Sequence, residues 1–214
     1  MKIAFYGSSL LSSYWNGAAT YYRGLLSELA TRGYEVAFYE PDAFDRQKHR
    51  DIDPPEWAEV VVYDATEAAA RAVIAEAAEA DVVVKASGVG VFDDLLLEGV
   101  IAAAMPHAVR IFWDVDAPAT LAEMRAHPDH PLRRMLGSLD AVLTYGGGPP
   151  VIEAYEGIGR EALPADLQRA RSGHPPSRSG RAAVRGRPQL PRQPLARPRG
   201  AGGAVLPRTR GAAG

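Results

Sequence analysis

Cysteine is absent from this chain of 214 residues, which excludes disulfide bonds and thiolate metal sites. Long apolar runs are absent as well, since none approaches the roughly 20 residues that a membrane-spanning helix needs. The first residues, MKIAFYG, lack the charged and then apolar profile, with a cleavage site, of a signal peptide. These absences lead us to expect a cytoplasmic protein without a membrane span.

Acidic residues and lysine are scarce in only one part of the chain. Residues 160–214 contain 12 arginines, no lysine and two acidic residues, Glu161 and Asp166, for a balance of +10. Residues 1–159 contain 12 basic and 24 acidic residues, for a balance of −12. A net charge of −2 therefore hides two segments of different character, which have to be interpreted separately.

The arginine-rich segment also lacks Ile, Phe, Tyr, Trp, Met and Asn. Such a segment cannot bury enough apolar surface to offset the loss of chain entropy, so residues 158–214 are predicted to be a disordered tail. One interpretation is a basic extension that binds nucleic acid electrostatically. The other, which we favour, is translation out of frame, because Arg, Pro, Gly and Ala have GC-rich codons. An alternative frame past codon 159 should then encode a further α/β domain.

Strands and helices alternate through residues 1–157. Runs rich in Val, Ile and aromatic residues predict strands, and periodic or alanine-rich segments between them predict helices. The strand runs show no in-out alternation, which is typical of a parallel sheet covered on both faces. Right-handed crossovers then give a doubly wound, mostly parallel Rossmann-like α/β sheet. The predicted strands are 2–6, 34–40, 60–63, 81–87, 109–114 and 141–145, and the predicted helices are 18–32, 66–80, 91–104, one from about Ala119, and 150–156.

Ligands of such sheets bind beyond the carboxyl ends of the strands. The first strand is followed by Gly7, Ser8 and Ser9, and the next helix starts near Asn16 and Gly17. This loop matches neither G-x-G-x-x-G nor G-x-x-x-x-G-K-[ST], which disfavours a nicotinamide or P-loop site. The free N–H groups at the helix start could bind an anion or a hydroxyl-rich ligand. The alternative is a serine-capped connector.

Asp114 ends the fifth predicted strand and Asp116 follows it, in the segment IFWDVDAP. Alternation along an extended strip would direct both carboxylates to one side, a geometry suited to a metal or to hydroxyl groups. The alternative is that these aspartates cap a helix or a turn.

Lys85 places a cation at the end of a strand expected to be buried. It either pairs with a carboxylate such as Asp114 or contacts substrate, with Gly88 allowing close approach of the backbone. Four aromatic residues could stack on a sugar ring, namely Tyr14, Trp15, Tyr21 and Tyr22. For Tyr21 and Tyr22 we favour the alternative, which is helix packing.

Five segments in order carry a resemblance that none of them carries alone: FYGSSLLSSYWNGAATYYRGLL, FYEPDAFDRQKHRDI, VVVKASGVGVFD, RIFWDVDAPATL and VLTYGGGPPVIEAYEGIG. Over residues 1–159 the chain resembles the N-terminal half of bacterial GT-B fold glycosyltransferases, close to the spore-maturation, glycosyl-transferase-like group. The resemblance implies two Rossmann-like domains facing across a cleft. The N-terminal domain would mainly hold the acceptor, and the C-terminal domain would hold a nucleotide-diphosphate sugar.

The resemblance also implies that residues 7–17 face the sugar and diphosphate, with Asp114 and Asp116 on the same rim as catalytic candidates. One aspartate would act as general base on an acceptor hydroxyl or orient it. Activity in this group usually needs no bound metal, and no cofactor other than the donor substrate is expected. The predicted substrate-binding residues are Gly7, Ser8, Ser9, Asn16, Gly17, Lys85, Ser87, Gly88, Gly146 and Gly147.

Without a donor domain the chain would be a truncated glycosyltransferase, inactive or nearly so, because catalysis needs both substrates held in register. A second hypothesis is a non-catalytic Rossmann-like binding module whose basic tail binds nucleic acid, although nucleic acid is the less expected partner. Salt-sensitive DNA or RNA binding that vanishes on deletion of 160–214 would favour the second hypothesis.

Overall fold

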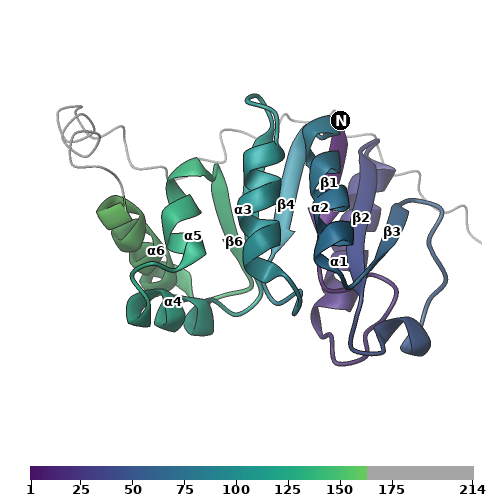
Figure 1. Ribbon diagram of the computed structural model, residues 1–214, viewed down its shortest axis with the longest axis horizontal. Helices are drawn as coiled ribbons and strands as arrows, with labels where there is room; N and C mark the ends of the chain where they lie inside the picture. Colours follow the sequence, from purple (N-terminus) through teal and green to yellow (C-terminus); the bar gives the residue numbers. More distant parts are fainter. Residues whose placement is uncertain (163–214) are drawn as a thin grey trace, which may run out of the picture. The chain divides into compact units, whose positions relative to one another are not determined.

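The computed structural model describes residues 1–162, which fold around one six-stranded sheet (Figure 1). All neighbouring strands are parallel, in the order β3-β2-β1-β4-β5-β6. This is the strand order of a Rossmann sheet, so the predicted α/β fold is confirmed. Every strand lies within two residues of its predicted bounds: β1 (Lys2–Tyr6), β2 (Glu35–Asp42), β3 (Glu59–Asp64), β4 (Val82–Ala86), β5 (Val109–Asp114) and β6 (Ala141–Thr144).

Helices connect most of these strands, with one departure from the predicted helices. The helix expected from Ala119 is two helices, because Pro128 and Pro131 interrupt it. The β2–β3 connection carries only the short 3-10 helix η1 (Arg46–His49), since its Pro54-Pro55 pair and aspartates disfavour a longer one. The α-helices are α1 (Ala18–Thr31), α2 (Glu67–Ala75), α3 (Asp93–Ala103), α4 (Ala117–Ala126), α5 (Pro131–Met135) and α6 (Gly148–Ala162), and two further 3-10 turns are η2 (Glu76–Glu79) and η3 (Leu136–Ser138).

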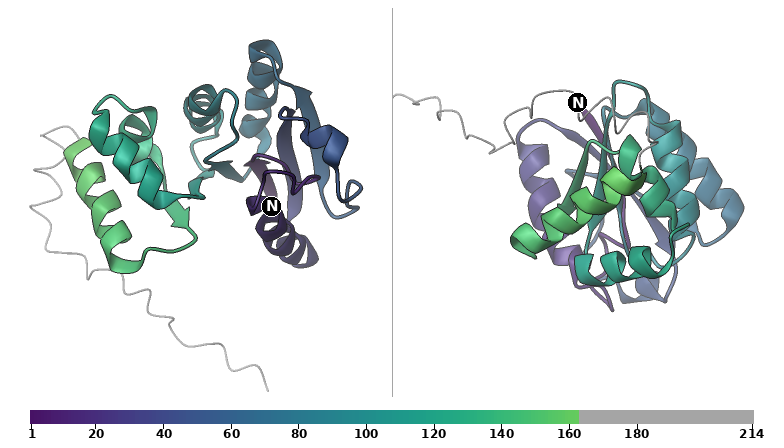
Figure 2. Two further views of the ribbon diagram at one scale, coloured as in Figure 1. Left: turned by 90° about the horizontal axis from the view of Figure 1, so that it is seen from below. Right: turned by 90° about the vertical axis from the view of Figure 1, so that its left-hand side faces the viewer.

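The two faces of the sheet are covered unequally. In the right-hand view of Figure 2, α1 (purple) lies on one side of the sheet and α2 and α3 (blue to teal) lie on the other. The α1 side holds a buried aromatic group in which Phe5 stacks on Phe38 at 5.1 Å, with Tyr22 and Trp113 packed around them. The opposite side buries small and aliphatic residues from α2, α3, α5 and α6. The doubly wound arrangement is therefore confirmed, with α1 as the main cover of one face.

Helix α6 continues to Ala162, so the expected boundary after residue 157 falls inside a helix. The composition change at Arg160 falls inside the same helix. The predictions made for the tail beyond residue 162 lie outside the described residues. Within residues 1–162, no helix combines the length and apolar character needed to cross a membrane.

Candidate functional site

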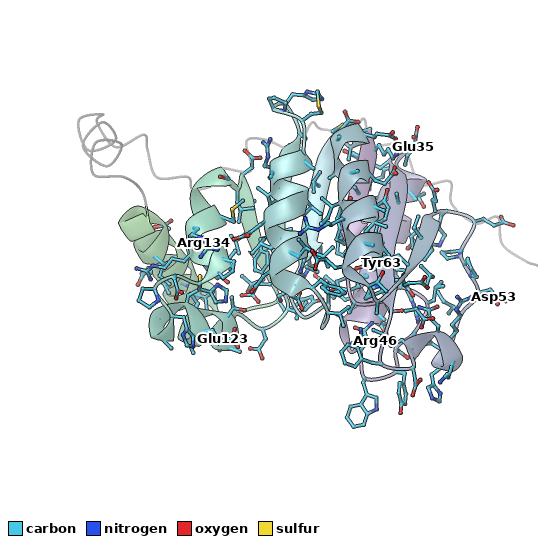
Figure 3. All side chains as sticks on the ribbon, viewed as in Figure 1. Glu35, Arg46, Asp53, Tyr63, Glu123 and Arg134 are labelled. Atoms are coloured by element: carbon cyan, nitrogen blue, oxygen red, sulfur yellow. The ribbon has the colours of Figure 1, made fainter. Side chains whose placement is uncertain are left out.

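The centre of the sheet is a point where the chain direction reverses. Strands β1 and β4 are neighbours, with Tyr6 opposite Lys85, but the chain leaves β1 toward β2 and leaves β4 toward β5. At such a switch point the loops diverge and leave a crevice at the carboxyl ends of the strands. Figure 3 shows Arg46 and Glu123 at this end of the sheet, the lower end in the view.

A cavity of about 380 Å³ opens in this crevice, and we call it the switch-point cavity. Residues from the loops after β1, β2, β4, β5 and β6 and from the first turns of α1 line it: Ser8, Trp15, Asn16, Gly17, Ala18, Tyr22, Arg46, Ser87, Gly88, Val115, Asp116 and Tyr145. Six residues predicted for the site are brought together here, namely Ser8, Asn16, Gly17, Ser87, Gly88 and Asp116. The others named by sequence, Gly7, Ser9, Lys85, Asp114, Gly146 and Gly147, do not line this cavity.

Glu40, a fully buried residue of β2, fixes the loop after β1 through hydrogen bonds. Its Oε2 accepts hydrogen bonds from the backbone N–H groups of Leu10, at 2.5 Å, and Leu11, at 3.3 Å. Its Oε1 accepts from the Ser9 hydroxyl at 2.9 Å and from Gln47 Nε2 at 2.6 Å. The Ser9 hydroxyl and two backbone amides of the loop therefore donate hydrogen bonds to this buried carboxylate. Ser9 therefore has a structural role in this loop, and its role as a ligand contact stays a prediction.

Asn16 closes the same loop through its side chain. Its Oδ1 accepts from the Ser8 hydroxyl at 2.8 Å, and its Nδ2 donates to the carbonyl oxygens of Ser9 and Ser12 at 2.9 and 3.0 Å. The Asn16 side chain consequently does not cap α1, and the N-cap residue Gly17 has no side chain to do so. The first turn of α1 meets the cavity without a side-chain cap.

Gly7 is explained by packing. A Cβ atom at this position would lie 2.6 Å from Cζ of Phe38, a separation at which the aromatic group would have to move. Packing against Phe38 therefore accounts for glycine at position 7, and the prediction that Gly7 contacts a ligand stays a prediction. Gly147 is similar, because its φ is +101° and a Cβ would lie 2.1 Å from Val151 at the start of α6. Gly146 and Gly147 are exposed and form the β6–α6 turn.

Asp114 and Asp116 occupy different environments, against the expectation that both carboxylates point the same way. Asp114 is fully buried and accepts from the hydroxyls of Thr120, at 2.8 Å, and Tyr155, at 2.5 Å. It also accepts from the Ser87 hydroxyl and the Asp116 backbone N–H. These partners give Asp114 a structural role, and its assignment as a catalytic residue stays a prediction. Asp116 is exposed, lines the cavity and caps α4 by accepting from Ala119 N at 3.3 Å.

Lys85 is buried and pairs with Asp93, not with Asp114. Its Nζ lies 2.8 Å from Asp93 Oδ1 and also donates to the Ala86 carbonyl at 2.5 Å. Burial lowers the pKa of Lys85, and the Asp93 carboxylate opposes that effect. Asp93 in turn accepts from the backbone N–H groups of Val89 and Gly90, at 3.2 and 2.7 Å. Lys85 thus anchors the β4–α3 loop through Asp93.

A second cavity of about 330 Å³ adjoins the first between α3 and α4. Lys85 and Asp93 contribute to its lining together with Asp94, Glu123 and His130, and it shares Ser87, Gly88, Val115 and Asp116 with the switch-point cavity. Among residues 1–159, no group of three or more histidine and carboxylate side chains is placed to hold a metal ion.

Backbone strain gathers around the switch point. The non-glycine residues with positive φ in the described chain are Trp15 (49°), Phe44 (57°), Asp45 (56°) and Phe92 (53°). All four lie in the loops that follow β1, β2 and β4. Non-glycine residues adopt this conformation at a cost, and such residues gather at functional sites. Trp15 is also 84% exposed although it lines the cavity.

Three residues at this site were not singled out by sequence: Glu40, Arg46 and Tyr145. Glu40 and Arg46 lie in or just after a predicted strand exit, where any charged residue is expected to be exposed. Arg46 is instead buried, and its Nη1 donates to the carbonyls of Ser8 and Val89 at 3.2 and 3.1 Å. It therefore joins the β1 and β4 loops across the switch point.

Comparison with known proteins shows no family for this chain. No family model matches it, and no curated protein matches it. Among solved structures, the pilus assembly protein CpaE from Caulobacter crescentus CB15 is 13% identical, with 74% of this chain and 90% of that chain covered and a TM-score of 0.30. A likeness at this level carries no argument about function.

Proposed function

We propose that the described domain is the acceptor-side half of a glycosyltransferase, which moves a hexosyl group from a nucleotide-diphosphate sugar to an acceptor hydroxyl. The observation that carries the proposal is the switch-point cavity. It combines an uncapped helix start, an exposed carboxylate and an exposed aromatic side chain at the place where open α/β sheets bind their ligands. The resemblance of the loop segments to GT-B glycosyltransferases supports the same conclusion.

Trp15 and Asp116 are the two groups that suit a sugar. The Trp15 ring is 84% exposed at the cavity and presents an apolar face against which the carbon-bound hydrogens of a sugar ring could pack. Asp116 is a hydrogen-bond acceptor for hydroxyl groups, since within residues 1–162 only the helix-capping bond from Ala119 N engages its carboxylate.

Asp116 takes the role of general base in this proposal. The acceptor oxygen forms a bond to the anomeric carbon, and the bond from that carbon to the diphosphate breaks. The diphosphate leaves with the electron pair, and the acceptor proton passes to Asp116. Asp114 cannot accept this proton without losing the hydrogen bonds that join it to Thr120 and Tyr155.

A donor-side wall is not part of the described domain. We keep the proposal that the segment after residue 159 is out of frame and that the alternative frame encodes a nucleotide-sugar domain. The nucleotide sequence across codons 155 to 215 tests this directly. On this proposal the 214-residue chain binds a sugar but does not complete transfer.

Saturation-transfer NMR with a panel of hexoses and their nucleotide diphosphates tests the proposed function. We expect sugar signals with the intact chain and their loss in Trp15→Ala, with an unchanged thermal unfolding midpoint because Trp15 is exposed. Met105→Ala is the control for loss of an exposed apolar side chain, because Met105 is 43% exposed and does not line the cavity. Absence of any sugar signal at millimolar concentration would contradict the proposal.

A further inference from the structure

The exposed side of helix α1 carries a groove that no part of the described chain fills. Its volume is about 510 Å³, which is in the range of small-molecule sites. We call it the α1 groove, and its lining comes from the first two turns of the helix: Gly17, Thr20, Tyr21, Gly24 and Leu25. Tyr21 and Leu25 are exposed although both are large and mostly apolar. The groove therefore keeps apolar surface in contact with water.

Gly24 keeps the floor of the groove open. An added Cβ would meet no atom within 4 Å, and the φ of Gly24 is not positive, so neither packing nor backbone conformation requires glycine there. Glycine in the exposed middle of a helix is destabilising relative to alanine. Gly17, seven residues earlier, also has open space where a Cβ would lie. The helix thus contains an unfavourable residue whose structural consequence is space in the groove.

The α1 groove presents no charge. None of its lining residues is acidic or basic. The neighbouring charges on α1 are paired, since Arg23 donates to both carboxylate oxygens of Asp51 at 2.7 and 2.9 Å, and Arg32 lies 2.9 Å from Glu28. An uncharged surface of this size, in a segment whose charge balance is −12, is complementary to a neutral ligand.

Few polar side chains line the groove. Thr20 and Tyr21 supply its only side-chain hydroxyls. A sugar ring carries several hydroxyl groups, and each needs a partner when it leaves water. An apolar group has no such need and gains by covering Leu25 and the Tyr21 ring. The groove therefore suits an apolar group better than a sugar.

Aromatic side chains connect the α1 groove to the switch-point cavity. Gly17 lines both spaces. The Tyr21 ring in the groove meets the Tyr145 ring edge-to-face, with 4.7 Å between the ring centroids, and Tyr145 lines the switch-point cavity. Trp113 packs beneath both rings, at 5.7 Å from Tyr21 and 6.0 Å from Tyr145. A ligand in the cavity can therefore extend across Tyr145 into the groove.

We propose that the α1 groove binds the apolar part, an aryl or alkyl group, of the acceptor, whose hydroxyl lies in the switch-point cavity. The apolar group covers Leu25 and packs against Tyr21, and Gly24 allows it to approach the helix backbone. The inference deepens the proposed function and rests on it in one respect, which is that the ligand is the acceptor of a sugar. The apolar class of the ligand follows from the lining of the groove.

Calorimetry of the 214-residue chain with three probes measures the preference: methyl, phenyl and hexyl β-glucoside. We expect the phenyl or the hexyl compound to bind at least about tenfold more tightly than the methyl compound, because a fully buried CH₂ group contributes about fourfold to a binding constant. Preference for phenyl assigns an aryl group, and preference for hexyl assigns an alkyl group. The preference should not weaken as salt is added, because no charge lines the groove.

Gly24→Leu gives opposite expectations for stability and binding. Leucine is a better helix former than glycine and its Cβ meets open space, so the thermal midpoint is unchanged or rises. The same side chain occupies the groove and weakens binding of the preferred glucoside at least about fivefold, with methyl glucoside unaffected. Gly157→Leu is the matched control, because Gly157 is a helical glycine with equally open space that lines neither the groove nor the cavity. Leu25→Ser, which removes exposed apolar lining, should also weaken binding and keeps the test decisive if Gly24→Leu does not fold.

Two results would overturn the inference. One is equal binding of all three glucosides, which would leave the proposed sugar site standing. The other is a dimer in analytical ultracentrifugation that Gly24→Leu dissociates, which would assign the groove to α1 of a second copy. Conversely, phenol or hexanol binding as tightly as its glucoside, with Gly24→Leu weakening both, would retain the apolar groove and argue against the sugar site. The failure of each proposal is therefore distinguishable.

Discussion

The hydroxyl of Tyr155 donates to Asp114 Oδ2 over 2.5 Å and thereby ties helix α6 to the end of strand β5. Both side chains are buried, and burial raises the pKa of the Tyr155 phenol, with the Asp114 carboxylate adding to the effect. A buried carboxylate is stable only when hydrogen bonds replace its hydration, and Tyr155 supplies one of four such bonds. The pair connects residues 41 positions apart in sequence.

Tyr155→Phe should lower the free energy of unfolding by about 1–3 kcal/mol, because it leaves one oxygen of a buried carboxylate without a donor. Urea unfolding measures the change. Tyr34→Phe is the matched control, since Tyr34 is half-buried and its hydroxyl makes no hydrogen bond within the described residues. If Tyr155→Phe were as stable as Tyr34→Phe, the Asp114 site would not be structural.

Gly7→Ala should destabilise the domain by about 1–3 kcal/mol, because overpacking a filled core forces neighbouring side chains to move. The new methyl group would lie 2.6 Å from the ring of Phe38. Gly24→Ala, in the exposed middle of α1 with no atom near the added Cβ, should instead stabilise it by about 0.5–1 kcal/mol. Thermal unfolding of both variants checks the two signs. A Gly7→Ala variant as stable as the intact chain would show that packing against Phe38 does not require glycine at this position.

The strands and their order of appearance could be predicted because buried parallel strands have a local signature. Val82–Ala86 and Val109–Asp114 are continuous runs of β-favouring residues, and such runs need no tertiary information to identify. The unequal cover of the sheet could also have been inferred from the Pro54-Pro55 segment, which cannot form a crossover helix of ordinary length.

The chemistry of the site depended on contacts that no local pattern encodes. Asp114 and Asp116 alternate in sequence, but the exposure of each is decided by whether α6 and α4 bring hydroxyl donors to it. Arg46 is buried because the loop after β2 crosses to reach Ser8 and Val89. For Lys85 the sequence left open a substrate contact or a carboxylate partner such as Asp114. Its partner is Asp93, the first residue of α3.

Asp51→Asn should reduce stability at pH 7 by up to about 1 kcal/mol, as expected for a partly exposed ion pair. The Arg23 guanidinium, bonded to both carboxylate oxygens at 2.7 and 2.9 Å, holds the pKa of Asp51 far below its usual value, with help from Ser13. A depressed folded-state pKa contributes stability above the unfolded value of about 3.9, and this contribution is lost as the pH falls below it.

The difference between the intact chain and Asp51→Asn should therefore be largest above pH 5 and shrink between pH 4 and pH 2, as measured by urea midpoints. Asp45→Asn, which removes the exposed pair with Lys48, is the control and should show no measurable effect. A difference independent of pH would mean that the carboxylate charge of Asp51 does not contribute.

Glu40→Gln should be the most disruptive change at the site although it alters one atom. The amide keeps one oxygen of Glu40 and replaces the other with an NH₂ donor. That donor would face either the Leu10 and Leu11 amides or the Ser9 hydroxyl, all of which now donate to Glu40. We expect a loss of about 2–4 kcal/mol and faster hydrogen exchange at Leu10 and Leu11. Glu35→Gln, on the same strand but exposed, is the control and should be neutral. Unchanged hydrogen exchange at Leu10 and Leu11 in Glu40→Gln would show that the Glu40 carboxylate does not hold this loop.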